Sequence, residues 1–226
     1  MLIEELKSLV KENADVIPYS ESNTSGTEGF KRDVACIVRP ITLGVIQELI
    51  KFAGSVVNTP NQFSLYPISS GKNWGYGSSM PSTVEEKVVL LDLCALNDIT
   101  YFDEENGVIS IQPGVTQSAL FEYLSSKQTS YMVPVTGAGP TTSILSNALE
   151  RGYGITPIAD HFTSVMSIKG FLADGSFYQS SLQCMSDMAN GDNSECYVDK
   201  TFKWKHGPYL DGIFTQSGNM IVTEIT

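Results

Sequence analysis

The sequence predicts an α+β fold built as two lobes, and three observations lead to this class. A strand, a helix and a second strand follow one another between residues 34 and 93. Apolar runs separated by turn signals follow from residue 94 onward and indicate an antiparallel arrangement. Hydrophobic residues make up 42% of the 226 positions, so the chain is long enough to bury a substantial core.

Residues 1–33 are expected to form an N-terminal helix and a loop. Leu6 and Val10 fall at helical spacing, with charged residues between the apolar ones. A Ser/Thr/Gly-rich stretch at 20–29 predicts the exposed loop. The charges from Glu4 onward are unlike a secretory signal peptide. No apolar run approaches the ~20 residues that a membrane span requires.

The first lobe is predicted to cover residues 34–93. A buried strand at 35–38 ends before the following Arg-Pro pair, and a helix capped by Thr42 comes next. A second strand at 64–68 leads into a run rich in glycine and serine. This β-α-β order predicts a lobe whose strand ends carry a ligand loop.

The second lobe is predicted to cover residues 94–226. We expect the strand at 88–92 to pair with a strand at 108–112 across the turn at 103–107. A helix is expected after Thr116, and residues 142–149 form either a short helix or a turn.

Farther along the chain, residues 164–179 predict a hairpin around Asp174-Gly175, a dipeptide that favours tight turns. The segment 182–200 is polar and weakly patterned, as in a long excursion. Late strands are expected at 213–214 and 220–223.

Charge and cysteine content narrow the function classes. A net charge of −11 and a pI of about 4.5 disfavour nucleic acid and anionic membranes as partners. Two histidines and four scattered cysteines offer no zinc spacing, so no metal site is expected. The cysteines indicate free thiols in a reducing, cytoplasmic compartment, although Cys184 and Cys196 are placed so that they can pair.

The loop after the strand at 64–68 is the most informative segment. Gly71, Gly75 and Gly77 let the backbone turn and approach a ligand closely. Successive N–H groups in such a loop can bind a diphosphate, but a plain turn has the same composition. The segment is neither a Walker A loop nor a Gly-x-Gly-x-x-Gly fingerprint.

Further motifs decide between these two interpretations because they recur in a fixed order. In that order the set resembles the FAD-binding (PCMH-type) domain of the vanillyl-alcohol oxidase / p-cresol methylhydroxylase flavoprotein family, and especially its members that oxidise 4-alkylphenols. The resemblance covers about residues 34–223. Besides the glycine loop, the motifs lie at 112–117, 133–139, 146–154, 156–161, 202–204, 207–212 and 214–222.

The resemblance implies a fold with FAD between the two lobes and the diphosphate on the glycine loop. Lys72 would add a positive charge there, or it is a solvated lysine. Tyr76 would lie near the flavin ring as a candidate catalytic residue that bonds a phenolic oxygen, or it is a packing residue. The implied cofactor-binding residues are Ser69, Ser70, Gly71, Lys72, Asn73, Trp74, Gly75, Tyr76, Gly137, Gly139, Thr142, Ser143, Asn147, Gly152, Gly154, Ile221 and Val222.

The sequence departs from the family at three places. Related proteins carry a flavin-linking histidine near Asn73, so this loop predicts non-covalent FAD. Phenol-oxidising members place an aspartate ahead of the second glycine stretch, whereas residues 135–139 contain no acid. The family continues into a substrate-binding cap domain after the last strand, and this sequence ends at Thr226, which predicts that the cap is absent.

Two functions are therefore predicted. The first is a flavin-dependent oxidoreductase of phenols or other small alcohols, and the second is a flavin-binding subunit that works with a partner chain. His161 beside Asp160 suits a base and its orienting carboxylate, although the resemblance treats this pair as structural. Glu150 and Arg151 are candidates for a local ion pair. The Pro-Gly turn before Thr116 is expected to shape the domain rather than bind an anion.

Overall fold

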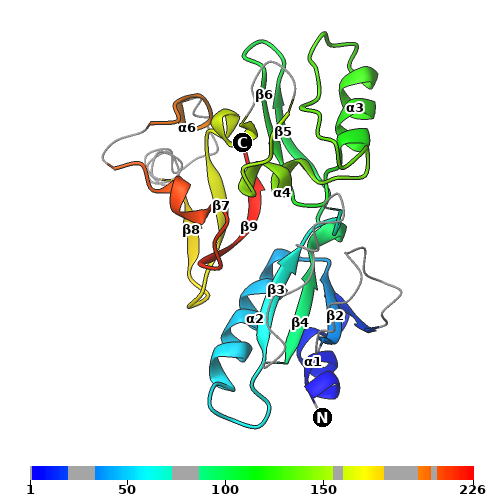
Figure 1. The fold of residues 1–226 in the computed structure, drawn as a ribbon, viewed down its shortest axis with the longest axis vertical. Helices are drawn as coiled ribbons and strands as arrows, with labels where there is room; N and C mark the ends of the chain where they lie inside the picture. Colours follow the sequence, from blue (N-terminus) through cyan, green and yellow to red (C-terminus); the bar gives the residue numbers. More distant parts are fainter. Residues whose placement is uncertain (1, 20–33, 73–86, 155–159, 181–197, 205–207) are drawn as a thin grey trace.

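Two β-sheets, one in each lobe, organise the chain (Figure 1). The computed structural model describes residues 2–19, 34–72, 87–154, 160–180, 198–204 and 208–226. The N-terminus lies at the first lobe and the C-terminus at the second. Among these residues, no helix combines the length and apolar character that a membrane span requires.

The first lobe contains four strands and two helices. These are α1 (Leu2–Val10), β1 (Ala14–Pro18), β2 (Val34–Pro40), α2 (Leu43–Ser55), β3 (Ser64–Ile68) and β4 (Val88–Asp92). The sheet order is β1-β2-β4-β3, in which β4 runs parallel to both β2 and β3. The antiparallel edge strand β1 was not predicted; it joins the N-terminal segment to this lobe's sheet.

Helix α2 covers this sheet because its apolar residues share one face. Val45, Ile46 and Leu49 recur at helical spacing and are buried against the strands. Thr42 holds the N-cap position as predicted, but its side chain makes no capping hydrogen bond. The predicted end of β2 is also slightly wrong, since the strand continues through the Arg-Pro pair to Pro40, opposite Ala14 of the edge strand.

The second lobe contains a five-stranded antiparallel sheet of order β5-β6-β9-β7-β8. Its strands are β5 (Ile99–Asp103), β6 (Val108–Ile111), β7 (Ile168–Leu172), β8 (Phe177–Gln179) and β9 (Met220–Ile225). The helical elements that follow β4 along the chain are η2 (Leu93–Ala95), α3 (Gln117–Ser126), α4 (Ile144–Leu149), η3 (His161–Ser164), α6 (Val198–Thr201) and η4 (Asp211–Phe214).

Two predictions about strands are wrong, and the first error arises from tertiary pairing. The partner of β6 across the predicted turn is β5, whereas β4 belongs to the first lobe's sheet. The expected strand at 213–214 is part of the 3-10 helix η4. The hairpin of β7 and β8 around Asp174-Gly175 is confirmed, with φ of +81° at Gly175.

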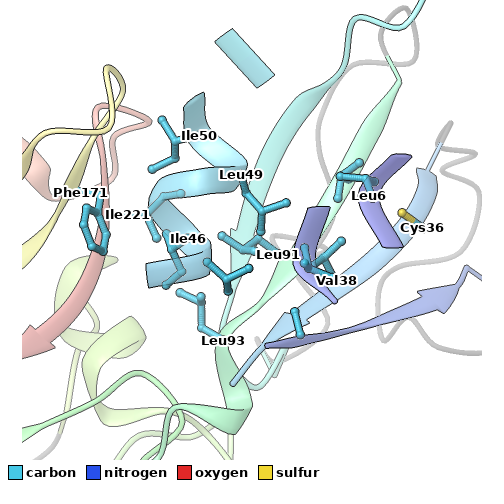
Figure 2. Packing of buried hydrophobic residues seen from close by; sticks show 14 of the residues in the cluster. Leu6, Cys36, Val38, Ile46, Leu49, Ile50, Leu91, Leu93, Phe171 and Ile221 are labelled. Atoms are coloured by element: carbon cyan, nitrogen blue, oxygen red, sulfur yellow. The ribbon is translucent and has the colours of Figure 1, made fainter. Parts of the chain in front are cut away.

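A hydrophobic core joins the two lobes (Figure 2). Phe171 of β7 and Ile221 of β9 lie beside Ile46 and Ile50 of α2, and Leu93 follows β4 in the same cluster. A second cluster fills the opposite side of the second sheet, beneath α3 and α4. Burial of apolar surface therefore stabilises the relative placement of the lobes as well as each lobe.

Candidate functional site

The glycine loop begins where β3 ends. Ser69 is buried, Gly71 has φ of +65°, and Lys72 is exposed. A positive φ of this size favours glycine, in agreement with Gly71 at this position. Residues 73–76, including the predicted contacts Asn73, Trp74, Gly75 and Tyr76, lie outside the described residues, so their roles stay predictions.

The start of the glycine loop contacts the first turn of α4 across the two lobes. The hydroxyl oxygens of Ser69 and Ser146 lie 2.5 Å apart, within hydrogen-bond distance. The Ser143 N–H donates to Ser70 Oγ at 3.3 Å. Three predicted residues from distant parts of the chain therefore meet at one point. Ser146 completes this hydroxyl cluster, and it was not among the predicted residues.

The Ser143 hydroxyl is used within the protein. The residue is fully buried, and its Oγ donates to the Pro113 carbonyl at 2.6 Å. The same Oγ accepts from the Ser146 N–H at 3.1 Å, so Ser143 is the N-cap of α4. Ser143 thus positions the helix and the serine cluster.

The first-turn N–H groups of α3 also form hydrogen bonds within the protein. The Gln117 and Ser118 N–H groups donate to the carbonyls of Thr142 and Pro140, at 3.0 and 2.9 Å. The Thr116 side chain accepts from the Ala119 N–H at 3.2 Å. These bonds occupy the first-turn donors that would otherwise attract an anion, in agreement with the expected shaping role.

Gln117, which sequence reasoning missed, holds the second glycine stretch in place. Its side chain donates to the Gly139 carbonyl at 3.0 Å and accepts from the Thr136 N–H at 3.3 Å. Gly139 has φ of +93°, and the Thr142 N–H donates to its carbonyl at 3.1 Å. The sequence offered one signal for this role, since Gln117 directly follows the helix cap Thr116. An amide side chain that is buried there needs hydrogen-bond partners. Gly137 lies exposed between these contacts.

Two glycines after α4 permit close packing. The Gly152 N–H donates to the Asn147 carbonyl at 2.7 Å, and a Cβ at this position would lie 2.0 Å from Asn147 Nδ2. A Cβ on Gly154 would lie 2.2 Å from His161 Nε2 and 2.8 Å from the Val135 carbonyl oxygen. No larger residue fits at either position without displacement of its neighbours.

His161 bonds Asn147 rather than Asp160. Its Nδ1 contacts Asn147 Oδ1, which assigns the proton to Nδ1 because an amide oxygen can only accept. Burial lowers the pKa of His161, and the nearby Asp160 carboxylate opposes this shift. Asp160 instead bonds Arg151 and caps η3 through the Phe162 N–H. The suggested His161–Asp160 arrangement and the suggested Glu150–Arg151 pair are therefore both absent among these residues.

The two predicted positions on β9 lie on opposite faces of the sheet. Ile221 faces the first lobe and belongs to the core that joins the lobes, whereas Val222 packs in the cluster beneath α3 and α4 (Figure 2). A cleft of about 640 Å³ runs between the lobes beside Ile221. Its wall includes Leu65 and Tyr66 of β3, just before the glycine loop. The strand that leads into the glycine loop therefore also lines this cleft.

Comparison with known proteins gives a consistent result. A family model described as an FAD binding domain matches residues 34–181. The chain is 27% identical over 218 residues to the flavoprotein subunit of a hydroxylating 4-cresol dehydrogenase from Pseudomonas putida, covering 96% of this chain and 39% of that protein. It is 35% identical over 162 residues to a 1'-carboxy-chondrochloren decarboxylase from Chondromyces crocatus, covering 72% of this chain and 28% of that protein.

Solved structures show the same fold. A p-cresol methylhydroxylase with substrate bound superposes with a TM-score of 0.82 at 25% identity, over 99% of this chain and 42% of that chain. A 4-ethylphenol oxidase from Gulosibacter chungangensis superposes with a TM-score of 0.81 at 22% identity, over 99% of this chain and 41% of that chain. The chain therefore spans less than half the length of these relatives.

Proposed function

Because the chain belongs to the family of FAD binding domains, we propose that it holds FAD non-covalently between its two lobes as the cofactor-binding part of an oxidoreductase. One observation carries the proposal: the serine contact between the glycine loop and α4 lies within the matched residues and joins the two lobes. Likeness of fold alone does not settle a function, so this local geometry is the stronger support.

The residues at this contact fit FAD. In a protein with a net charge of −11, a diphosphate needs local donors, which the glycine loop and the exposed Lys72 supply. Among the described residues, the buried Thr142 Oγ1 has no hydrogen-bond partner. Buried hydroxyls are normally satisfied, so a polar cofactor group beside Thr142 would complete this site.

When bound, FAD would accept a hydride at its N5 position. The chain's own residues contribute binding and orientation. Ser69, Ser70 and Gly71 would hold the diphosphate arm, while Ser143 and Gln117 fix the segments that face it. The apolar part of the wall of the cleft between the lobes, which includes Phe63, Leu65 and Phe171, would exclude water from part of the cofactor.

A visible absorption spectrum before and after acid precipitation tests this proposal. Purified protein should show flavin bands, and the colour should move to the supernatant because no flavin-linking histidine accompanies Asn73. Colour kept in the pellet would contradict the non-covalent link. A chain that stays colourless and leaves the fluorescence of added FAD unchanged would refute the function.

The substrates are proposed to be para-substituted phenols or other small alcohols. The 4-cresol dehydrogenase and 4-ethylphenol oxidase named above support phenols, and the decarboxylase, whose name specifies a carboxy substrate, suggests adding carboxylated phenols to a screen. Anaerobic bleaching of the flavin would identify a substrate. Since the chain covers 39% of the 4-cresol dehydrogenase subunit, the screen should include the protein together with any co-purifying chain.

A flavin-binding subunit that works with a partner is the alternative, and exposed apolar side chains favour it. Met132, Tyr153 and Trp204 are 70%, 75% and 65% exposed. Exposed apolar side chains mark a docking site when they form a contiguous patch, and these three are the candidates for one. Co-purification of a second polypeptide that raises flavin reduction would support this alternative, whereas full activity of the isolated chain would exclude it.

A further inference from the structure

Asn147, Gly152, Gly154 and His161 form a closed set of contacts around the buried His161 imidazole, which we call the clasp. The backbone N–H of His161 donates to the Gly152 carbonyl at 3.1 Å, and the ring nitrogen Nδ1 contacts Asn147 Oδ1. The Gly152 N–H returns to the Asn147 carbonyl, and Gly154 packs against the far edge of the ring. His161 therefore connects the end of α4 to both glycines that follow it.

Helix α4 depends on such external contacts because it has only six residues. A helix this short is not stable by itself in water. Ser143 caps its beginning, while His161 holds Asn147 in its last turn. Ser146, one residue before Asn147, contacts Ser69 of the glycine loop. Movement of the clasp would thus be transmitted directly to the serine cluster.

The clasp suits a neutral imidazole and not a charged one. His161 is 6% exposed, and its Nε2 has no hydrogen-bond partner among the described residues. This edge of the ring faces Gly154 so closely that no Cβ fits between them. A second N–H at Nε2 would therefore be a buried donor without an acceptor, which is costly.

Among the charges near His161, the Asp160 carboxylate favours the protonated imidazole, but burial disfavours it more strongly. Asp160 lies on the same element, but Arg151 pairs with it. Lys203 donates to the Phe162 carbonyl at 2.7 Å, and Lys200 lines the cavity that His161 also lines. Arg151 thus takes up part of the Asp160 charge, and burial remains the larger influence on the protonation of the imidazole.

We infer that His161 is a positioning residue that holds α4 and the serine cluster against the glycine loop only while its ring is neutral, so that FAD retention falls in acid. This inference rests on the proposed FAD function. The direction follows from linkage: burial lowers the pKa of His161 in the folded chain, so the unfolded chain binds more protons below its ordinary value of about 6.5. The clasp is at full strength above that pH, its contribution declines below it, and it is lost as the pH falls through the lower pKa of His161 in the folded chain.

The experiment measures FAD affinity and apo-protein thermal stability at pH 7.5 and pH 5.5 for matched variants. His161→Asn places an amide N–H where Nδ1 sits and does not titrate, so the bond to Asn147 can persist. His161→Leu removes this donor at similar bulk. His206→Asn is the control at the chain's other histidine.

Wild-type protein and His206→Asn should bind FAD more weakly at pH 5.5 than at pH 7.5, by up to about tenfold, the limit for one imidazole with an ordinary pKa of about 6.5. His161→Asn should bind nearly equally at both values, and His161→Leu should bind weakly at both. A pH response that His161→Asn retains, or one that His206→Asn abolishes, would overturn the inference. Absence of FAD binding at pH 7.5 would refute the proposed function. The pH response of the apo-protein melting temperature then still tests the clasp, because it should be smaller in His161→Asn than in wild type.

Discussion

Replacement of Ser143 by alanine should destabilise the chain before any cofactor is added. The substitution removes the N-cap of α4, which typically costs about 0.5–2 kcal/mol. It also leaves the Pro113 carbonyl, buried and bonded to Ser143 Oγ at 2.6 Å, without this donor, at about 1–3 kcal/mol. The two effects share one hydroxyl, so we expect a combined loss of roughly 2–4 kcal/mol in the free energy of unfolding.

Urea unfolding of the apo-protein, followed by circular dichroism, measures this loss. Ser126→Ala is the matched control, because the Ser126 hydroxyl donates to the Tyr123 carbonyl at 2.6 Å but is exposed. Its effect should stay within about 0.5 kcal/mol. The reasoning would be refuted if Ser143→Ala unfolded like wild type but lost FAD affinity, since Ser143 would then act on the cofactor and not on the helix.

Other predictions concern the glycine loop, the clasp and the buried thiols. Lys72→Ala should weaken FAD binding by up to about fivefold in a fluorescence titration, because an exposed charge pair is worth about 0.2–1 kcal/mol. The loss should be larger at low salt than at high salt, because salt screens exposed charges. The control Lys87→Ala should leave FAD binding unchanged. Gly152→Ala should lower the melting temperature, with a loss of about 1–3 kcal/mol, because its Cβ would lie 2.6 Å from the Asn147 carbonyl oxygen. Burial raises the pKa of the Cys36 thiol to about 11 from its ordinary 9.0, so this thiol should resist alkylation in the native protein at neutral pH. The free energy of unfolding should fall as the pH rises above 9.0, because the unfolded chain loses the thiol proton at a lower pH than the folded chain does. Rapid alkylation of Cys36 in the native protein would contradict this last prediction.

Short sequence patterns predicted the helices and turns that are determined by residues near one another in the chain. The spacing of Val45, Ile46 and Leu49 predicted α2, because one apolar face suffices to define a buried helix. Asp174-Gly175 predicted the β7–β8 hairpin, because the turn needs a residue that tolerates positive φ. The serines and glycines of the candidate site were predicted in the same way, from composition and from the order of the motifs.

Pairing between distant segments could not be predicted in this way. The run at 88–92 is apolar throughout, and such a strand fits either a parallel central position or an antiparallel partner. Its place between β2 and β3 depends on the packing of α2 across the sheet. For the same reason His161 and Asp160, adjacent in sequence, take different partners.

The sequence by itself determined the two-lobed α+β class, the glycine loop and the resemblance to FAD-binding domains, because these depend on residue types and their order. Only the tertiary structure decided which polar groups remain available to a ligand. It assigned the Ser143 hydroxyl to a helix cap, Gln117 to the glycine stretch and His161 to Asn147. Each assignment depends on hydrogen-bond distances between segments that are separated in the chain, and a buried polar group takes the partner that folding brings within reach.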